Sequence, residues 1–347
     1  MINVGIAGIG FMGMIHYLAY QRVRGARVAA IATRDAKKRA GDWRGIQGNF
    51  GPPGAMMELG GAAAYAELDE LLDDPKIDLV DLCLPPALHA PAAIAALAAG
   101  KHVFCEKPIS VTMADAEKMV RGAEQTGKLL LIGQVLPFFP EYDFVRKTVA
   151  AGKHGRLLGG HFKRIISHPT WLPDFYDPKK VGGPLVDLHV HDAHFIRLLC
   201  GMPQSVFSRG RMRGEVVEFA DTQFLFADDS LCVTAASGVI QQQRRAFTHG
   251  FEIHLERATL LYDFSVIGGK PELSMPLTLL DRRGKVERPK LGSGDPVEAF
   301  VAEINEVVRS IRAGNPSPLL AGELARDALR LCHKQTQSVR SGKVVKV

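Results

Sequence analysis

A short apolar run that ends in a glycine loop most constrains the fold of this chain. Residues 2–7 predict a buried parallel strand, and residues 14–22 predict a helix. Between them stands the loop Gly8-Ile9-Gly10-Phe11-Met12-Gly13. In such a loop Gly8 permits the tight turn, Gly10 lets the backbone approach a pyrophosphate, and Gly13 lets the helix pack close to the strand. Strand, loop and helix N-terminus together predict a dinucleotide-binding unit.

Strands and helices alternate from this loop to about residue 133. Apolar runs predict further strands at 27–32, 77–84, 102–105 and 129–132, with helices at 91–99 and 114–126. This rhythm is typical of a doubly wound parallel sheet, which makes the first half α/β. Residues 41–64 interrupt it, because the run Gly-Asn-Phe-Gly-Pro-Pro-Gly at 48–54 predicts a long loop. A functional role and disorder are both open for that loop.

The second half has a different pattern. Strands are predicted at 159–167, 222–226, 251–256 and 277–280, with a turn at 281–284, and these are signals of an antiparallel sheet. Helices are predicted at 296–312 and 322–340. A length of 347 residues suffices for two domains. We therefore predict an NAD(P)-binding Rossmann domain at 1–133 and an α+β domain at 134–347.

Composition excludes several classes of protein. The net charge is +6, but the basic residues are dispersed and form no stripe for nucleic acid. The five cysteines are odd in number and form no C-x-x-C pair, which favours free thiols in a reducing compartment. The apolar stretch 82–99 contains three prolines and a histidine, which argues against a membrane span. With no visible secretion signal, we expect a cytoplasmic protein that binds neither membrane nor nucleic acid.

The end of the second strand bears on the choice of cofactor. An NAD-selective site usually places an acidic residue here to bind the ribose 2′-hydroxyl. This chain has Thr33 and Arg34, whose hydroxyl and guanidinium suit a 2′-phosphate. Asp35 follows and can still reach a ribose, and Arg34 can be a solvated surface charge. The residues favour NADP over NAD.

Three further motifs carry a family resemblance. They are Leu84-Pro85-Pro86-Ala87-Leu88-His89, then Gly100-Lys101-His102-Val103-Phe104-Cys105-Glu106-Lys107-Pro108, and finally the stretch 182–192, which ends in Asp187-Leu188-His189-Val190-His191-Asp192. With the glycine loop, they resemble the Gfo/Idh/MocA oxidoreductases over nearly the whole chain. The resemblance implies a Rossmann domain followed by a large open-faced, mainly antiparallel sheet. It also implies self-association through that sheet, as a dimer or tetramer, and sugars, polyols or cyclitols as substrates.

The resemblance also implies roles for individual residues. His191 matches the family's base, which takes the hydroxyl proton when hydride leaves a carbinol carbon. Lys107 holds the substrate oxygen and stabilises alkoxide character. Asp187 lies four residues before His191 and shares its face if the segment is helical. The cofactor is expected to contact the glycine loop with Phe11 and Met12, the second strand end, and Leu84, Pro85, His89, Glu106 and Lys107.

The remaining candidates concern substrate and metal. His168, Trp171 and His194 are candidate substrate contacts beside Lys107, Asp187 and His191, although aromatic residues in loops often serve only packing. Three histidines, His189, His191 and His194, invite a zinc site with Asp192. Positions 189 and 191 of a helix point away from each other, so we expect no metal.

Two departures from the family leave the substrate open: residues 136–140 lack an arginine that is common there, and the long 41–64 loop is atypical. Pro184 also replaces a frequent third glycine, which should not affect the chemistry. A ligand sensor that kept the fold and lost turnover is the alternative to an enzyme. Because Lys107, Asp187 and His191 are all present, the sequence favours the enzyme.

Overall fold

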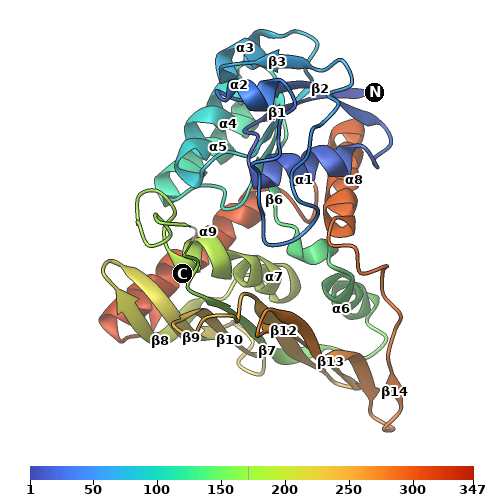
Figure 1. The fold of residues 1–347 in the computed structure, drawn as a ribbon. Coiled ribbons are helices and arrows are strands. Elements are labelled where there is room, and N and C mark those ends of the chain that lie inside the picture. Colours follow the sequence, from blue (N-terminus) through green and yellow to red (C-terminus); the bar gives the residue numbers. More distant parts are fainter. Residues whose placement is uncertain (171) are drawn as a thin grey trace. The chain divides into compact units, whose positions relative to one another are not determined.

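The computed structural model describes residues 1–170 and 172–347, which form two compact units (Figure 1). The first unit comprises Met1–Phe138 and Gly292–Arg326, and the second comprises Phe139–Leu291 and Asp327–Val347. The sequence pattern predicts a single division after residue 133. The first unit also takes a later segment because helix α8 (Glu298–Ala313) packs against α1 (Phe11–Tyr20).

The first unit contains a six-stranded sheet in the order β3-β2-β1-β4-β5-β6. All its neighbours pair in parallel, as the alternating pattern predicts. The strands are β1 (Ile2–Ala7), β2 (Ala26–Ala32), β3 (Ala63–Tyr65), β4 (Leu79–Leu82), β5 (His102–Glu106) and β6 (Leu130–Gly133). The strand order reverses beside β1, so the crevice for a ligand is expected at the carboxyl ends of β1 and β4.

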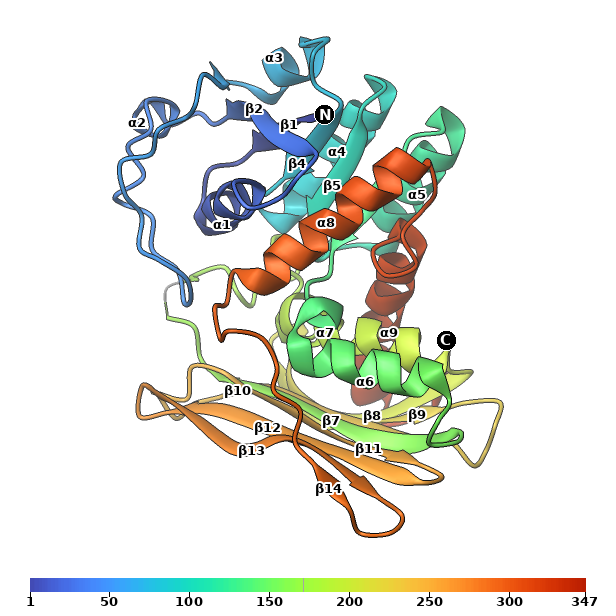
Figure 2. The same ribbon diagram turned by 90° about the vertical axis from the view of Figure 1, so that its right-hand side faces the viewer.

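Helices cover both faces of this sheet. Helices α1 and α8 pack together on one face, and α4 (His89–Ala98) packs against α5 (Met113–Thr126) on the other (Figure 2). Shorter elements are α2 (Ala36–Arg39), α3 (Leu68–Asp73) and the 3₁₀ turns η1 (Pro86–Leu88) and η2 (Leu136–Phe138). Helix α5 begins at a Thr112 cap, whose hydroxyl accepts from the Asp115 N–H. It ends at Gly127 with φ +66°.

The segment between α2 and β3 is a long, anchored loop. Trp43 has no exposed surface and packs edge-on against Tyr17 of α1 at 5.0 Å between ring centroids. An isolated bridge joins Asp42 to Met56. Phe50 stacks on Phe300 of α8 at 5.4 Å. These contacts hold the loop against two helices of its own unit.

The second unit is built on a nine-stranded sheet in the order β14-β13-β12-β11-β7-β10-β9-β8-β15. Its pairs are antiparallel except β7 with β10, which run parallel. The strands are β7 (Leu157–Ser167), β8 (Ser205–Arg213), β9 (Val216–Leu225), β10 (Cys232–Ile240), β11 (Thr248–Leu255), β12 (Ala258–Ile267), β13 (Lys270–Asp281), β14 (Val286–Glu287) and β15 (Val345–Lys346). This is the mainly antiparallel second sheet that the resemblance implies.

One face of this sheet is covered and the other is open. Helices α6 (Pro140–Ala151) and α7 (Val190–Cys200), and α9 (Gly322–Ser341) from Asp327 onward, cover one face (Figure 2). Inward side chains such as Phe162 and Phe251 are buried, while His161 and Glu252 on the other face are exposed. Among the described helices of the whole chain, none has the length and apolar character needed to cross a membrane.

Candidate active site

The three glycines between β1 and α1 are needed for different reasons. Gly8 has φ +96°, and a Cβ there would lie 2.5 Å from the Cys83 carbonyl oxygen. A Cβ on Gly13 would lie 2.1 Å from the Gly8 carbonyl oxygen. At Gly10 a Cβ would meet no described atom within 4 Å, so packing within the chain does not demand glycine. The open space at this helix N-terminus fits the approach of a pyrophosphate.

Phe11 and Met12 lie half-buried at the start of α1. The Phe11 ring meets the Phe50 ring edge-on, with 4.8 Å between centroids. The long loop therefore packs directly beside the glycine loop. A contact of Phe11 or Met12 with the cofactor stays a prediction.

The end of β2 presents a hydroxyl and an exposed cation. Arg34 is exposed and Thr33 is half-buried. Asp35 caps helix α2, because its Oδ1 accepts from the N–H groups of Lys37 at 2.9 Å and Lys38 at 3.3 Å. This cap uses one oxygen of the carboxylate that would otherwise compete for a ribose hydroxyl.

A depression of about 580 Å³ lies beside this strand end. It is lined by Asp35, Lys37, Lys38, Asp42, Arg44 and Gly45. Arg44 holds Asp42 through two hydrogen bonds of 2.9 and 2.8 Å, and this pairing lowers the pKa of Asp42 to about 2. One of the two acids is thus paired and the other caps a helix, which leaves a lining with basic character.

The loops after β4 and β5 are joined by His89. Its Nδ1 lies 2.7 Å from the Pro108 carbonyl oxygen, and its Nε2 lies 2.7 Å from the Leu84 carbonyl oxygen. The ring has no exposed surface, and burial lowers the pKa of His89. In the described structure His89 therefore acts on the two loops, and the loop residues Leu84 and Pro85 remain the candidates for direct cofactor contact.

Lys107 stands out in its surroundings by exposure. From residue 103 to 111 every residue is buried except Lys107, which is half-buried. Glu106 is 7% exposed, and its Oε2 accepts a 3.1 Å hydrogen bond from the Lys107 backbone N–H. Lys107 thus follows the carboxyl end of β5, at the edge where doubly wound sheets bind their ligands.

In the second unit, Asp187 and His191 share one face. The segment Leu185–His189 is a π-helical turn that runs directly into α7. The chain is thus helical from Asp187 to His191, and residues four apart on a helix lie on the same face. From residue 183 to 196 every residue is buried except Asp187 and His191, which are both half-buried. The shared face that a helix predicts is therefore present.

Two residues near Asp187 and His191 in the sequence contact side chains of β7 and α9. Asp192 is buried and accepts two hydrogen bonds of 2.6 and 3.1 Å from Arg164 of β7. His189 Nε2 lies 2.9 Å from Gln335 of α9, and burial lowers the pKa of His189 to about 4. Asp192 and His189 are thus engaged away from the Asp187 and His191 face, and the zinc interpretation has no support from their contacts.

The other substrate candidates differ in their burial and contacts. His168 stacks on Tyr176 at 5.4 Å, and its Nδ1 lies 3.2 Å from the Tyr176 hydroxyl. Arg213 lies over the Tyr176 ring at 4.0 Å. His194 is fully buried in α7. Trp171 lies outside the described residues. The substrate roles of all three candidates stay predictions.

Several buried polar residues of the first unit lie outside the motifs found in the sequence. His16 on α1, Asp81 on β4, Glu303 on α8 and Gln134 after β6 have no exposed surface. His16 and Asp81 meet with Cys83 in a group whose ligand atoms lie within 4.8 Å of one another. The one available signal is polarity: Asp81 interrupts an apolar strand, and His16 interrupts the buried face of α1.

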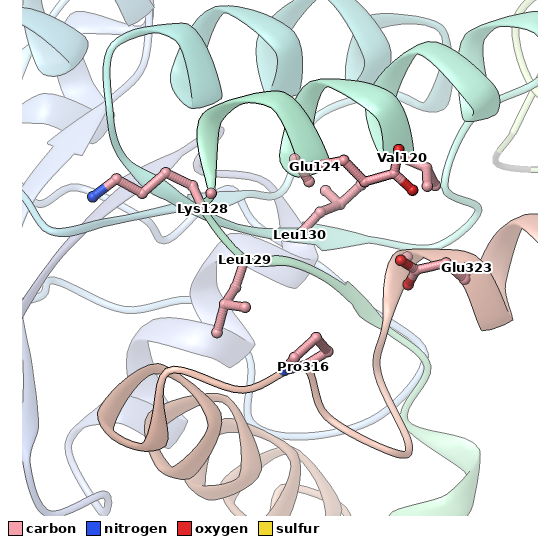
Figure 3. Close-up of a pocket in the computed structure, with 10 residues that line it drawn as sticks. Val120, Glu124, Lys128, Leu129, Leu130, Pro316 and Glu323 are labelled. Atoms are coloured by element: carbon pink, nitrogen blue, oxygen red, sulfur yellow. The ribbon is translucent and has the colours of Figure 1, made fainter.

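A second cavity lies away from these residues. It has a volume of about 190 Å³. Its lining includes Glu124, Lys128, Leu129, Leu130 and Glu323 (Figure 3). It borders the start of β6, whereas ligands of doubly wound sheets bind at the carboxyl ends of the strands. We therefore give it no part in cofactor binding.

Comparisons with known proteins agree with this geometry. The family model described as "Oxidoreductase family, NAD-binding Rossmann fold" matches residues 2–134, and the model of the GFO/IDH/MocA C-terminal domain matches residues 142–261. Myo-inositol 2-dehydrogenase of Thermotoga maritima is 25% identical, over 100% of this chain and 98% of that protein. 1,5-Anhydro-D-fructose reductase of Ensifer adhaerens is 28% identical, over 77% of this chain and 78% of that protein.

Solved structures support the same fold. A levoglucosan dehydrogenase in complex with NADH and levoglucosan superposes with a TM-score of 0.80 at 20% identity, over 100% of this chain and 99% of that one. The two family models together cover more than half of the sequence, and both halves have the expected sheets. The chain belongs to the Gfo/Idh/MocA family of oxidoreductases.

Proposed function

We propose that this oxidoreductase transfers a hydride between a nicotinamide cofactor and a hydroxyl-bearing carbon of a sugar, polyol or cyclitol. The relatives named above, an inositol dehydrogenase and an anhydrofructose reductase, support this substrate class. The observation that carries the proposal is that three candidate residues are more exposed than the residues around them. Lys107, Asp187 and His191 are the half-buried residues of segments that are otherwise buried.

The chemistry needs a base, a cation and an orienting carboxylate. When bound, nicotinamide supplies the hydride acceptor or donor. His191 takes the proton of the substrate hydroxyl in oxidation and returns it in reduction. The Lys107 ammonium donates to the reacting oxygen and stabilises its developing negative charge. Asp187 shares the face of His191 and binds a neighbouring hydroxyl of the substrate.

NADP is the favoured cofactor. The open space at Gly10 and the N-terminus of α1 would receive the pyrophosphate. Arg34, Lys37 and Lys38 would meet a 2′-phosphate, because Asp35 and Asp42 are occupied by a helix cap and an arginine. Self-association through the open face of the second sheet and a cytoplasmic location complete the proposal.

A substrate panel tests this function directly. Sugars, inositols and polyols, with their keto forms, are incubated with NADP or NAD, and absorbance of the reduced cofactor is followed. Turnover of at least one compound is expected. Lys107→Met should lower turnover on every substrate while NADP affinity stays near wild type. Binding of cofactor and sugar without any turnover would instead identify a sensor, and a loss confined to cofactor affinity would remove Lys107 from the reacting oxygen.

A further inference from the structure

A chain of buried polar groups leads from the interior of the first unit to Lys107. His16 Nδ1 lies 2.9 Å from Oδ2 and 3.1 Å from Oδ1 of Asp81. On the other side of the ring, His16 Nε2 lies 3.0 Å from Glu106 Oε1, which is an ion-pair contact rather than an aligned hydrogen bond. The second oxygen of Glu106 accepts the backbone N–H of Lys107. The order Asp81, His16, Glu106, Lys107 therefore connects β4 and α1 to the end of β5.

The partners of His16 determine its protonation. An ionised carboxylate only accepts hydrogen bonds, so a ring nitrogen facing one must carry a proton. Both nitrogens of His16 face carboxylates, and a neutral imidazole has only one N–H. Burial is the largest single effect and opposes charge on the ring, but the charges of Asp81 and Cys83 and the hydrogen bonds with them together outweigh it and hold the pKa of His16 well above its usual value. His16 is thus an imidazolium between two carboxylates.

Burial favours the neutral form of three other groups near the ring, which are Glu303, Cys83 and Tyr20. Glu303 reaches the cluster from α8, and its carboxylate oxygens have no hydrogen-bond partner within the described chain. Burial, with the charge of Glu106, raises the pKa of Glu303 well above its usual value. Burial likewise raises the pKa of Cys83 and of Tyr20. His16 therefore places a positive charge beside the Glu106 carboxylate.

We propose that His16 is a positioning residue for Lys107: its imidazolium bridges Asp81 and Glu106 and so fixes the carboxylate that holds the Lys107 backbone. The proposal rests on the assignment of Lys107 to the reacting oxygen. Without the bridge, Glu106 keeps its backbone contact but loses the cation that fixes its side chain. A displacement of a catalytic group by about 1 Å can cost about 10²-fold in rate.

A metal in place of the bridging proton is the main competing interpretation. His16, Asp81 and Cys83 have a ligand set that zinc accepts, and a carboxylate on the far ring nitrogen is common in zinc sites. Burial of Cys83 disfavours the thiolate that a metal requires. The present contacts, with Asp81 at hydrogen-bond distance from Nδ1, favour a proton.

The first experiment measures the protonation of His16 and does not require turnover. Long-range ¹H–¹⁵N spectra of the ¹⁵N-histidine-labelled protein, with His16 assigned from His16→Gln, should show protons on both ring nitrogens at neutral pH. A ring with one protonated nitrogen would overturn the bridge. So would a stoichiometric metal in the purified protein that is lost in His16→Gln. This result does not depend on whether a substrate is known, so it separates the bridge from the proposed function.

The second experiment measures how the loss of the His16 bridge changes the kinetic constants. His16→Phe keeps the stacking on Phe104, whose ring centroid is 5.3 Å away, and removes both N–H groups. We expect kcat to fall about 10–100-fold with little change in KM or in the Kd for NADPH, and His16→Gln to recover part of the loss. His102→Gln is the matched control, because His102 begins the same strand β5 at its other end. If His16→Phe lowers thermal stability and leaves kcat near wild type, His16 is structural only.

Discussion

At the residue scale, Lys107 and His191 share one arrangement. Each is half-buried in a segment that is otherwise buried. Each also has a buried neighbour in the sequence that is paired with another side chain. Glu106 precedes Lys107 and contacts His16, while Asp192 follows His191 and binds Arg164. A buried ion pair costs desolvation, and its loss leaves an unpaired charge, so such pairs fix geometry more reliably than they add stability. Lys107 and His191 thus each lie next to a buried residue that is paired with another element.

The proposed role of His191 as the base can be tested by removing its imidazole. His191→Ala should lower turnover by about 10²–10⁴-fold, because a positioned general base contributes on that order. Affinity for the cofactor, measured by NADPH fluorescence, should stay nearly unchanged. His154→Ala, a histidine of the same unit outside the motif, serves as the control. Near-normal turnover of His191→Ala would remove His191 from the mechanism.

His189 gives a prediction for stability against pH. Its pKa is about 4 in the folded chain, against an ordinary value of 6.5. Between these values the unfolded chain binds a proton that the folded chain does not. The free energy of unfolding therefore falls as pH falls through this range, by about 3 kcal/mol in all. His89 and His249, whose pKa values burial also lowers, act with the same sign.

The contribution of His189 is isolated by difference. Urea unfolding of wild type and His189→Gln is compared at several pH values from neutral to about 4.5. The lower limit lies just above the pKa of His189 in the folded chain. The two stabilities should converge as pH falls, because the variant lacks the proton uptake on unfolding. Parallel curves would show that His189 titrates normally.

At the element scale, strand ends carry most of the cofactor site. Loops follow β1, β2, β4 and β5 at the carboxyl edge of the first sheet, and all the predicted cofactor residues lie in or beside these loops. The glycine loop and the strand before it were predictable, because turn geometry and backbone approach demand particular residue types. The bridging role of His89 was not, since sequence does not show which carbonyl oxygens a buried ring will reach.

The β2 end gives a prediction on cofactor choice. A charge-assisted contact with a 2′-phosphate contributes about 1.5–3 kcal/mol, or roughly 10–150-fold in affinity. Arg34→Ala should therefore weaken NADP much more than NAD. Thr33→Asp should go further, because a carboxylate repels the 2′-phosphate and accepts from the ribose of NAD. Both cofactors are titrated against wild type and the two variants, with Arg24→Ala as a surface control. Tighter binding of NAD than NADP by the wild type would transfer the ribose to Asp35.

At the scale of the whole molecule, hydrophobic periodicity predicted the two sheets better than the division of the chain. The parallel sheet follows from alternating strands and helices, and the predicted strands lie within a few residues of β1, β2, β4, β5 and β6. Strand β3 is not among them, because it begins inside the segment 41–64 that the sequence predicts as a loop. Periodicity does not show which sheet a late helix joins, and α8 packs on α1 of the first unit. Likewise, the π-helical turn at Leu185–His189 has no composition that distinguishes it from an α-helix.

The open face of the second sheet gives the last prediction. Outward residues there are polar but include small and partly exposed apolar side chains, such as Ala236 on β10 and Leu261 on β12. Ala236 pairs with Lys163 of β7 and Asp221 of β9, so it lies in the middle of the sheet. If two copies associate through this face, Ala236→Arg places a long charged side chain at the interface and should shift the protein to the monomer in sedimentation experiments. Ala151→Arg makes the same change on α6, at the covered face, and should leave association unchanged. An oligomer that persists in Ala236→Arg, or a wild type that is monomeric, would contradict association through this sheet.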